Sequence, residues 1–327
     1  MSFMKGYINN MNILITGGTG FLGSHLTKRL INEVDSITIL TTNVRQNTSL
    51  KSLGVDNHKK INLVKGDVRD FDFLRLLFVE YEFDGIFHLA ALSEVRKCQS
   101  DAKLAFDINV GGTINVLEVA RLYGNVKFVI VSSSDKAYGK GKLPYLEDYL
   151  LNGTATYEVS KSATDLIARS YYNNYGLPTV VTRCSNLYGG GDMNFSRVIP
   201  NNIRKILSGE CPMVWRGSEE SVREFLYVDD AVDAYLTLID NIEITKGNAY
   251  NIGSGEKITI QRLLQLLLNI MDSNLNIEYK SKSFPEISNQ YLDSTKIKND
   301  TGWKSKINLE TGLTKTIDFY KKYYDKS

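Results

Sequence analysis

Short apolar runs without polar alternation recur along the chain, and segments long enough to form helices separate them. Strands that are apolar on both sides are typical of a parallel sheet covered by helices on both faces. The pattern therefore predicts an α/β fold with a doubly wound parallel sheet. The expected strands are residues 12–16, 36–41, 61–64, 85–89, 127–131 and 179–182, and the expected helices include 24–32, 102–123 and 160–175.

The first apolar run leads directly into GGTGFLG and then into an amphipathic segment. Gly17, Gly20 and Gly23 would let the chain turn tightly, approach a pyrophosphate with its backbone and pack the new helix on the sheet. Three such glycines also occur in ordinary loops, but the strand before them and the helix after them favour a cofactor site. The loop therefore predicts a Rossmann-type dinucleotide-binding domain.

The regular alternation of apolar runs and helix-length segments ends near Gly189, and short mixed elements follow. We expect the dinucleotide-binding domain to comprise residues 11–188, with a return segment near 223–252. Most of residues 189–327 would then form a smaller C-terminal cap domain that binds the substrate.

The choice between NAD and NADP depends on the end of the second expected strand, where an acidic residue would hold the adenosine ribose. Thr41 and Thr42 stand there, with Arg45 nearby, and this leaves the choice open. Asp67 is placed to reach the adenine, although an Asp in such a turn also caps helices. The candidate cofactor-binding residues are Gly17, Thr19, Gly20, Phe21, Leu22, Gly23, Thr41, Asp67, Val68, Leu89, Ala90, Ala91, Tyr157 and Lys161.

The fourth expected strand ends in His88, Leu89, Ala90 and Ala91. The small residues of this run would let a nicotinamide ribose and a phosphate sit close to the backbone. His88 is one of three histidines, and we interpret it as a packing residue of the core.

Tyr157 and Lys161 are four residues apart at the start of a helical segment, so both side chains lie on one face. A phenol with a pKa near 10 is a poor base, and a cation one turn away would lower that pKa. Such pairs also arise by chance. The hydroxyl-rich run Ser132–Gly139 (SSSDKAYG) after the fifth strand strengthens this assignment, although serines there could also cap a loop.

Composition narrows the range of partners. The chain has 39 basic and 37 acidic side chains and a net charge of +2, without a basic cluster for nucleic acid or an anionic membrane. Three separated cysteines form neither a disulfide framework nor a metal site. No apolar run approaches the roughly 18 residues of a membrane span. We therefore expect a cytoplasmic protein without a metal.

Several motifs occur in one order along nearly the whole chain. They are TGGTGFLGSHL, HLAA, NVGGT, YEVSK, RCSNLYGGGD, REFLYVDD, YLDSTK and TGW. In this order they resemble the extended short-chain dehydrogenases/reductases that act on nucleotide sugars, which implies NAD as the cofactor. SSDKAYG resembles the version found in 4,6-dehydratases. Its Asp-Lys pair, with the GGGD and QYLDS segments, is most similar to the CDP-glucose 4,6-dehydratase branch.

The resemblance implies a role for each residue of the candidate catalytic set. Tyr157 would take the proton of the sugar 4-hydroxyl while hydride leaves C4, with Ser134 and Lys161 holding the alcohol, the phenolate and the cofactor ribose. Asp135 would protonate the leaving C6 hydroxyl, which requires a raised pKa. Lys136 would be either the C5 base or a stabiliser of the enolate. Both enter one site only if the strand has ended before them, and the alternative is a surface ion pair.

The resemblance also implies a diphosphate site. A guanidinium can bind two phosphate oxygens at once, which suits Arg to this task, although any of these arginines could be a surface ion-pair partner. The candidate substrate-binding residues are Ser93, Asn186, Arg197, Arg216 and Arg223. Asp229 and Asp230 could form a metal site, but we interpret them as acids at a helix N-terminus.

These observations lead to three hypotheses. The first is an NAD-dependent nucleotide-sugar 4,6-dehydratase that acts on CDP-glucose. The second is a 4-epimerase or 4-dehydrogenase on the same scaffold, and the third is a dinucleotide-binding sensor without turnover. The helices expected at 102–123 and 160–175 resemble those of a four-helix dimer interface, so we expect a homodimer.

Overall fold

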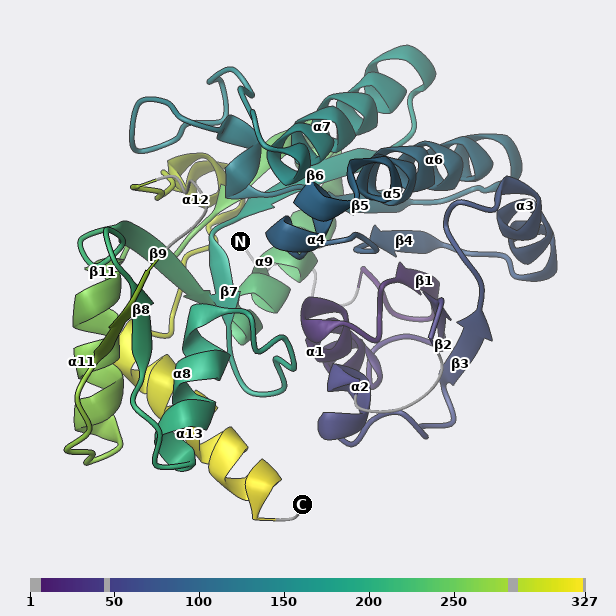
Figure 1. The fold of residues 1–327 in the computed structure, drawn as a ribbon. Coiled ribbons are helices and arrows are strands. Elements are labelled where there is room, and N and C mark those ends of the chain that lie inside the picture. The colour runs from purple at the N-terminus through teal and green to yellow at the C-terminus, as the bar shows by residue number, and fades with distance from the viewer. Residues whose placement is uncertain (1–6, 44–47, 282–287, 326–327) are drawn as a thin grey trace.

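A parallel sheet of seven strands forms the centre of the computed structural model, which describes residues 7–43, 48–281 and 288–325 (Figure 1). The strand order is β10-β6-β5-β4-β1-β2-β3. The order runs outward in opposite directions from β1 and β4, which confirms the predicted doubly wound sheet. The strands are β1 (Asn12–Thr16), β2 (Ser36–Thr41), β3 (Ile61–Lys65), β4 (Gly85–His88), β5 (Phe128–Ser132), β6 (Thr179–Cys184) and β10 (Ala249–Ile252).

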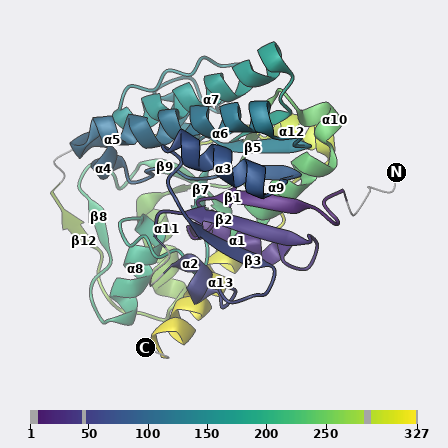
Figure 2. The same cartoon turned by 90° about the vertical axis from the view of Figure 1, so that its right-hand side faces the viewer.

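Helices cover both faces of this sheet, as Figures 1 and 2 show. One face carries α3 (Phe71–Glu80), α6 (Gly112–Tyr123) and α7 (Thr156–Tyr175), and the other carries α1 (Phe21–Leu30) and α9 (Val228–Asp240). Ile13 and Ile15 pack in the core on the α1 side, while Leu14 packs in the core on the α3 side. Because both faces are buried, the strands have no polar alternation.

Several boundaries differ from the prediction. The helix expected at 102–123 consists of α5 (Ala102–Phe106), a π-helical turn (Asp107–Gly111) and α6. The buried Asn109 lies in this turn and bonds to Leu92 and Ser160 across the junction. We infer that these tertiary hydrogen bonds stabilise the wider turn, which periodicity alone does not reveal.

Helix α7 begins at Thr156, four residues before the expected start, so Tyr157 and Lys161 both lie in it. Strand β3 was expected to be buried, but it is an edge strand with Leu63 38% exposed.

The elements after β6 build a second, smaller assembly with its own apolar core, which includes Leu264 and Leu313. Its strands are β7 (Asn186–Tyr188), β9 (Val222–Tyr227) and β11 (Lys257–Thr259) in one sheet, and β8 (Met213–Trp215) and β12 (Glu278–Lys280) in another. Its helices are α8 (Val198–Leu207), α11 (Ile260–Ile270) and α13 (Leu309–Tyr324).

The chain returns to the large sheet after this assembly begins. Strand β10 pairs with β6, and α9 packs against α1. Ile297, from α12 (Thr295–Thr301), and Trp303 also enter the core on the α1 side. The remaining helices are α2 (Ser49–Ser52), α4 (Val95–Ser100), α10 (Ile242–Thr245) and the 3₁₀ turn η2 (Asp135–Tyr138). Among the helices of the described residues, none has the length and apolarity to cross a membrane.

Candidate active site

The residues predicted to carry the chemistry follow the carboxyl ends of three neighbouring strands. The glycine loop follows β1, the residues after His88 follow β4, and the run from Ser133 to Tyr138 follows β5. Because these strands are parallel and adjacent, the three segments meet at one edge of the sheet. Ligands of open α/β sheets bind at this edge.

The glycine loop has the geometry of an anion cradle. Gly17 has a φ of +73°, and a Cβ on it would lie 2.8 Å from the backbone nitrogen of Ala90. A Cβ on Gly23 would lie 2.6 Å from the carbonyl oxygen of Gly17. Gly20 is the N-cap of α1 and brings no side chain to the first-turn amides, and this turn has no acidic residue. These amides therefore face the loop without a negative neighbour in their own turn.

Phe21 and Leu22 begin α1, and the buried Phe21 packs edge to face against His25 of the same helix. Thr19 and Thr41 lie side by side, with their Oγ1 atoms 3.1 Å apart. Thr41 thus occupies the end of β2, the position at which an acidic residue would hold the adenosine ribose. Arg45 lies outside the described residues.

Asp67 does not act as a simple helix cap. Its carboxylate accepts hydrogen bonds from the Arg69 guanidinium, one of them at 2.7 Å, and these bonds lower the pKa of Asp67. The cap of α3 is Asp70 instead. Asp67 and Arg69 line a shallow hollow beside the end of β3, where the adenine is expected. The neighbouring Val68 is buried against Gly112.

His88 lies fully buried below the glycine loop. Its Nδ1 is 2.8 Å from Thr16 Oγ1, and its Nε2 is 3.0 Å from Thr113 Oγ1. The Thr113 hydroxyl donates to the carbonyl oxygen of Asn109 at 2.6 Å, so Thr113 accepts from Nε2 and Thr16 donates to Nδ1. Burial, followed by the charge of Lys161, lowers the pKa of His88 to about 3. His88 is therefore neutral and holds the end of β1 in place, in agreement with the predicted packing role.

The segment after β4 approaches the loop closely. The backbone nitrogen of Leu89 donates to Thr16 O at 3.1 Å, and that of Ala90 donates to Thr16 Oγ1 at 3.2 Å. Leu89, Ala90 and Ala91 are half-buried, and Ser93 beyond them is exposed. The backbone of Leu89 and Ala90 passes so close to Gly17 that a Cβ on Gly17 would lie 2.9 Å from the carbonyl carbon of Leu89.

Tyr157, Lys161 and Ser134 come together at the junction of β5 and α7. Ser134 hydrogen-bonds to the Tyr157 phenol, and Lys161 Nζ donates to the carbonyl oxygen of Ser132 at 2.6 Å. Burial raises the pKa of Tyr157 to about 12, and the Ser134 hydrogen bond opposes this effect. Burial lowers the pKa of Lys161 to about 8. The expected lowering of the Tyr157 pKa by Lys161 is therefore wrong for the protein alone, because desolvation dominates.

Asp135 and Lys136 lie beyond the end of β5, in η2, so strand alternation does not separate them. Asp135 is 2% exposed, and its Oδ1 accepts from Ser134 Oγ at 3.0 Å and lies 3.5 Å from Lys136 Nζ. Its Oδ2 is buried without a hydrogen-bond partner among the described residues. The pair is thus an internal cluster beside Ser134, and the alternative of a surface ion pair is wrong.

Asn186 joins this cluster to the smaller assembly. Its Oδ1 accepts from Lys136 Nζ at 3.4 Å, and its Nδ2 donates to the carbonyl oxygen of Glu224 at 3.1 Å. Arg223, which precedes Glu224 on β9, is 5% exposed and donates to Val222 O and Ser288 O. Asn186 and Arg223 therefore lie on paired strands next to the Asp135–Lys136 cluster.

The other two arginines of the predicted substrate set are placed differently. Arg197 pairs with the buried Asp192 at 2.9 Å, and its charge is near enough to lower the pKa of Tyr157. Arg216 is exposed after β8, and its Nε is 3.4 Å from the carbonyl oxygen of Tyr279. Arg197 thus lies on the active-site side, whereas Arg216 lies beside the β8–β12 sheet.

Three buried polar residues in or next to the site were not predicted from the sequence. Asn109 bridges Leu92 to Ser160, and the Glu224 carboxylate accepts from the backbone nitrogens of Gly255 and Leu292. Arg183 is fully buried and bonds to Asp165 of α7. Asn109 and Arg183 belong to the motifs NVGGT and RCSNLYG, so polar residues inside apolar segments were the available signal.

Asp229 and Asp230 do not face a common site. Asp229 lies 3.2 Å from His25 Nδ1, while Asp230 Oδ2 accepts from Ser305 Oγ at 2.7 Å and from the backbone nitrogen of Ile307 at 2.9 Å. Both lie in the first turn of α9, as expected for acids at a helix N-terminus. Across the described ranges, no three His, Cys, Asp or Glu side chains gather as a metal site would need.

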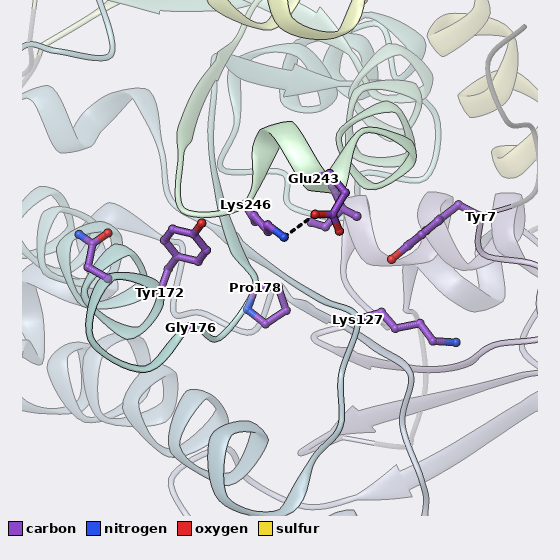
Figure 3. Close-up of a pocket in the computed structure, with 9 residues that line it drawn as sticks. Tyr7, Lys127, Tyr172, Gly176, Pro178, Glu243 and Lys246 are labelled. Atoms are coloured by element: carbon purple, nitrogen blue, oxygen red, sulfur yellow. Dashed lines mark hydrogen bonds and ion pairs between the residues drawn. The ribbon is translucent and has the colours of Figure 1, made fainter.

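A separate open cavity of about 770 Å³ lies at the opposite edge of the sheet (Figure 3). Lys127 and Pro178, which line it, precede β5 and β6, so the cavity is at the amino ends of the strands. Glu243 and Lys246 form an ion pair within it. None of the predicted site residues lines this cavity, so it is not the candidate active site.

The comparisons with known proteins agree with this geometry. The family model described as GDP-mannose 4,6 dehydratase matches residues 14–316. The chain belongs to this family. Among its relatives, the dTDP-glucose 4,6-dehydratase of Haemophilus influenzae is 31% identical, and the match covers 95% of this chain and 98% of the relative.

The solved structures that are similar to this chain include both dehydratases and epimerases. The dTDP-glucose 4,6-dehydratase of Streptomyces venezuelae, solved with NAD, is 28% identical with a TM-score of 0.88, covering 96% of this chain and 98% of that one. The UDP-glucose 4-epimerase of Thermotoga maritima is also 28% identical with a TM-score of 0.88, covering 96% and 100%. The predicted resemblance to nucleotide-sugar enzymes of this fold is confirmed.

Proposed function

We propose that the protein is an NAD-dependent nucleotide-sugar 4,6-dehydratase, with CDP-glucose as the preferred substrate. The observation that carries this proposal is the cluster of the buried Asp135 and the partly exposed Lys136 next to Ser134, because elimination needs an acid and a base beyond the groups that oxidise C4. An epimerase or 4-dehydrogenase uses only the oxidation at C4 and has no task for the second pair.

The glycine loop fits a nicotinamide dinucleotide. The close approach of Gly17 and Gly23 to neighbouring backbone leaves no room for a Cβ, and the first-turn amides after Gly20 are available to a pyrophosphate. Thr19 and Thr41 would lie beside the adenosine ribose, and Asp67 beside the adenine. Thr41 carries no charge to repel or attract a 2′-phosphate. NAD is proposed because the related dehydratase was solved with NAD.

The first half of the reaction uses Tyr157, Ser134 and Lys161. Tyr157 acts as a phenolate when it takes the proton of the sugar 4-hydroxyl, and the Ser134 hydrogen bond, which opposes the effect of burial on the pKa of Tyr157, favours that form. The Ser134 hydroxyl also holds the sugar oxygen. A dinucleotide held by the loop of Gly17, Gly20 and Gly23 would supply a hydride acceptor for C4 and a hydride donor for C6. Lys161 stabilises the phenolate electrostatically, which requires its charged form, and its pKa of about 8 keeps it charged at neutral pH.

The second half uses Asp135 and Lys136. The 4-keto group acidifies the C5 hydrogen. Lys136 either takes that proton itself or, as a cation, stabilises the enolate while a water molecule takes the proton. Asp135 gives a proton to the C6 oxygen, which leaves as water. Asn186 holds Lys136 through its side-chain oxygen, and Arg223 and Arg197 would bind the diphosphate.

The assay incubates the purified protein with CDP-, dTDP-, UDP- and GDP-glucose and measures loss of water by mass spectrometry. We expect Asp135→Asn to oxidise C4 in a single turnover but to lose water roughly 10²–10⁴-fold more slowly, because a positioned acid contributes that factor. Asp230→Asn is the matched control, since it neutralises a buried carboxylate outside the site.

Two outcomes would contradict the proposal. The first is water loss at the parent rate in Asp135→Asn, and the second is a parent protein that removes water from none of these sugars. An epimerase or 4-dehydrogenase would then take its place. Water loss from dTDP-glucose but not from CDP-glucose would overturn only the choice of nucleobase, which depends on the Asp-Lys pair of the motif.

We further propose that the protein forms a homodimer through α6 and α7. Exposed apolar side chains gather on these two helices, namely Ile114, Leu122, Tyr123, Leu166 and Tyr175. Exposed patches of this kind are typical of interaction surfaces. Light scattering of the purified protein measures the mass that decides this.

A further inference from the structure

A fully buried arginine lies behind the candidate active site. Arg183, on β6, is 0% exposed, and its Nε and Nη2 donate to Asp165 Oδ2 at 2.7 Å and to Oδ1 at 3.0 Å. Asp165 is equally buried. Removing both charges from water is so costly that such pairs often stabilise a fold no better than apolar residues would. We therefore infer that the two hydrogen bonds of this pair orient the elements that carry it, rather than mainly stabilise the fold.

The first partner of Arg183 belongs to the helix of the catalytic tyrosine. Asp165 follows Lys161 by four residues and Tyr157 by eight on α7, so the three side chains project from one side of the helix. Two parallel hydrogen bonds hold the Asp165 carboxylate in a single orientation. Rotation or sliding of α7 against β6 would break them, so Arg183 fixes the position of α7.

The second partner belongs to the turn of the proposed acid and base. Arg183 Nη1 donates to Tyr138 Oη at 2.6 Å, and Tyr138 Oη donates in turn to Asn251 Oδ1 at 2.7 Å on β10. Tyr138 is 2% exposed and ends η2, the turn that begins with Asp135 and Lys136. The same guanidinium thus holds α7 through one edge and η2 through another.

We propose that Arg183 is a positioning residue that fixes the Asp135–Lys136 pair relative to Tyr157. This inference rests on the proposed dehydratase function, in which Tyr157 acts at C4 while Asp135 acts at C6 of the same sugar. Because the sugar spans both groups, the separation between them must match the distance between the two oxygens. A displacement of one group by about 1 Å can cost roughly 100-fold in rate.

Other contacts join the same elements and should keep the fold intact when one link is lost. Ser162 Oγ donates to the carbonyl oxygen of Ala137 at 2.8 Å, and Ser133 Oγ donates to that of Lys161 at 3.1 Å. Tyr138 also stacks on Tyr145, with ring centroids 4.7 Å apart. A Tyr138→Phe variant keeps the ring and these contacts and removes only the hydroxyl that receives the Arg183 hydrogen bond.

The experiment compares Tyr138→Phe with Tyr250→Phe in the cofactor-bound protein. The hydroxyl of Tyr250, on β10, donates to Asp300 Oδ2 on α12 at 2.8 Å, so its removal deletes a similar hydrogen bond outside the Arg183 network. For Tyr138→Phe we expect C4 oxidation within about 2-fold of the parent and water loss slower by roughly 10- to 100-fold. Tyr250→Phe should change neither step. Single-turnover cofactor absorbance and product mass measure the two steps, and a crystal structure measures the separation of Asp135 from Tyr157.

If Tyr138→Phe leaves the ratio of the C4 oxidation rate to the water-loss rate unchanged, the positioning role is overturned. If the parent never loses water, the proposed function fails, and the crystal structure then decides this inference separately. A changed Asp135-to-Tyr157 separation in Tyr138→Phe alone would support the positioning role. The same separation in the variant and the parent would refute it.

Discussion

Because His88 is buried in its neutral form, the protein should lose stability when the pH is lowered. Its Nε2 donates to Thr113 and its Nδ1 accepts from Thr16, so a second proton on Nδ1 would end the hydrogen bond in which Thr16 donates. Burial is the larger cause that moves the pKa of His88 from its usual 6.5 to about 3, and the charge of Lys161 adds to it. His88 therefore stays neutral in the folded protein at a pH where it is charged in the unfolded chain.

The sign and the size of the change in the free energy of unfolding follow from this difference in pKa. Below about pH 6.5, His88 binds a proton in the unfolded chain but not in the folded protein. The free energy of unfolding therefore decreases as the pH falls. Each pH unit in this window costs about 1.4 kcal/mol. Between about pH 6.5 and about pH 5, His88 should therefore remove roughly 2 kcal/mol of stability.

Urea unfolding of the parent and of His88→Gln, measured across this pH range, tests the reasoning. The variant has no titrating ring, so its free energy of unfolding should fall less steeply by about 2 kcal/mol in total. His58→Gln, which removes a partly exposed histidine, is the control. Parallel pH dependence in the parent and His88→Gln would refute the buried neutral assignment.

Two further predictions concern the reaction and the cofactor. In Tyr157→Phe the proton acceptor for the 4-hydroxyl is lost, so single-turnover C4 oxidation should fall by at least about 10²-fold while calorimetric substrate affinity changes little. Turnover at the parent rate would remove Tyr157 from its role. In Gly23→Ala the new Cβ would lie 2.6 Å from the carbonyl oxygen of Gly17, so the loop must shift and NAD affinity should fall. Gly141→Ala, whose Cβ would lie 3.7 Å from Tyr145, is the control. If Gly23→Ala binds NAD as tightly as the parent, the glycine loop is not the pyrophosphate site.

Features that depend on neighbouring residues could be predicted from the sequence. The spacing of Gly17, Gly20 and Gly23 reflects a local backbone requirement, and the apolar runs reflect burial on both sides of each strand. The four-residue spacing of Tyr157 and Lys161 follows helical geometry. For this reason the main strands, the cofactor loop and the tyrosine helix agree with the structure to within a few residues.

What only the tertiary structure decided depends on partners far apart in the chain. Arg183 meets Tyr138 across 45 residues, and Asn186 meets Lys136 across 50. No local pattern encodes such pairings, because they arise from the order in which the strands lie side by side. The pKa of Tyr157 illustrates this dependence. The spacing to Lys161 suggested a lowered value, but the packed site raises it to about 12, because burial from all sides outweighs one nearby cation.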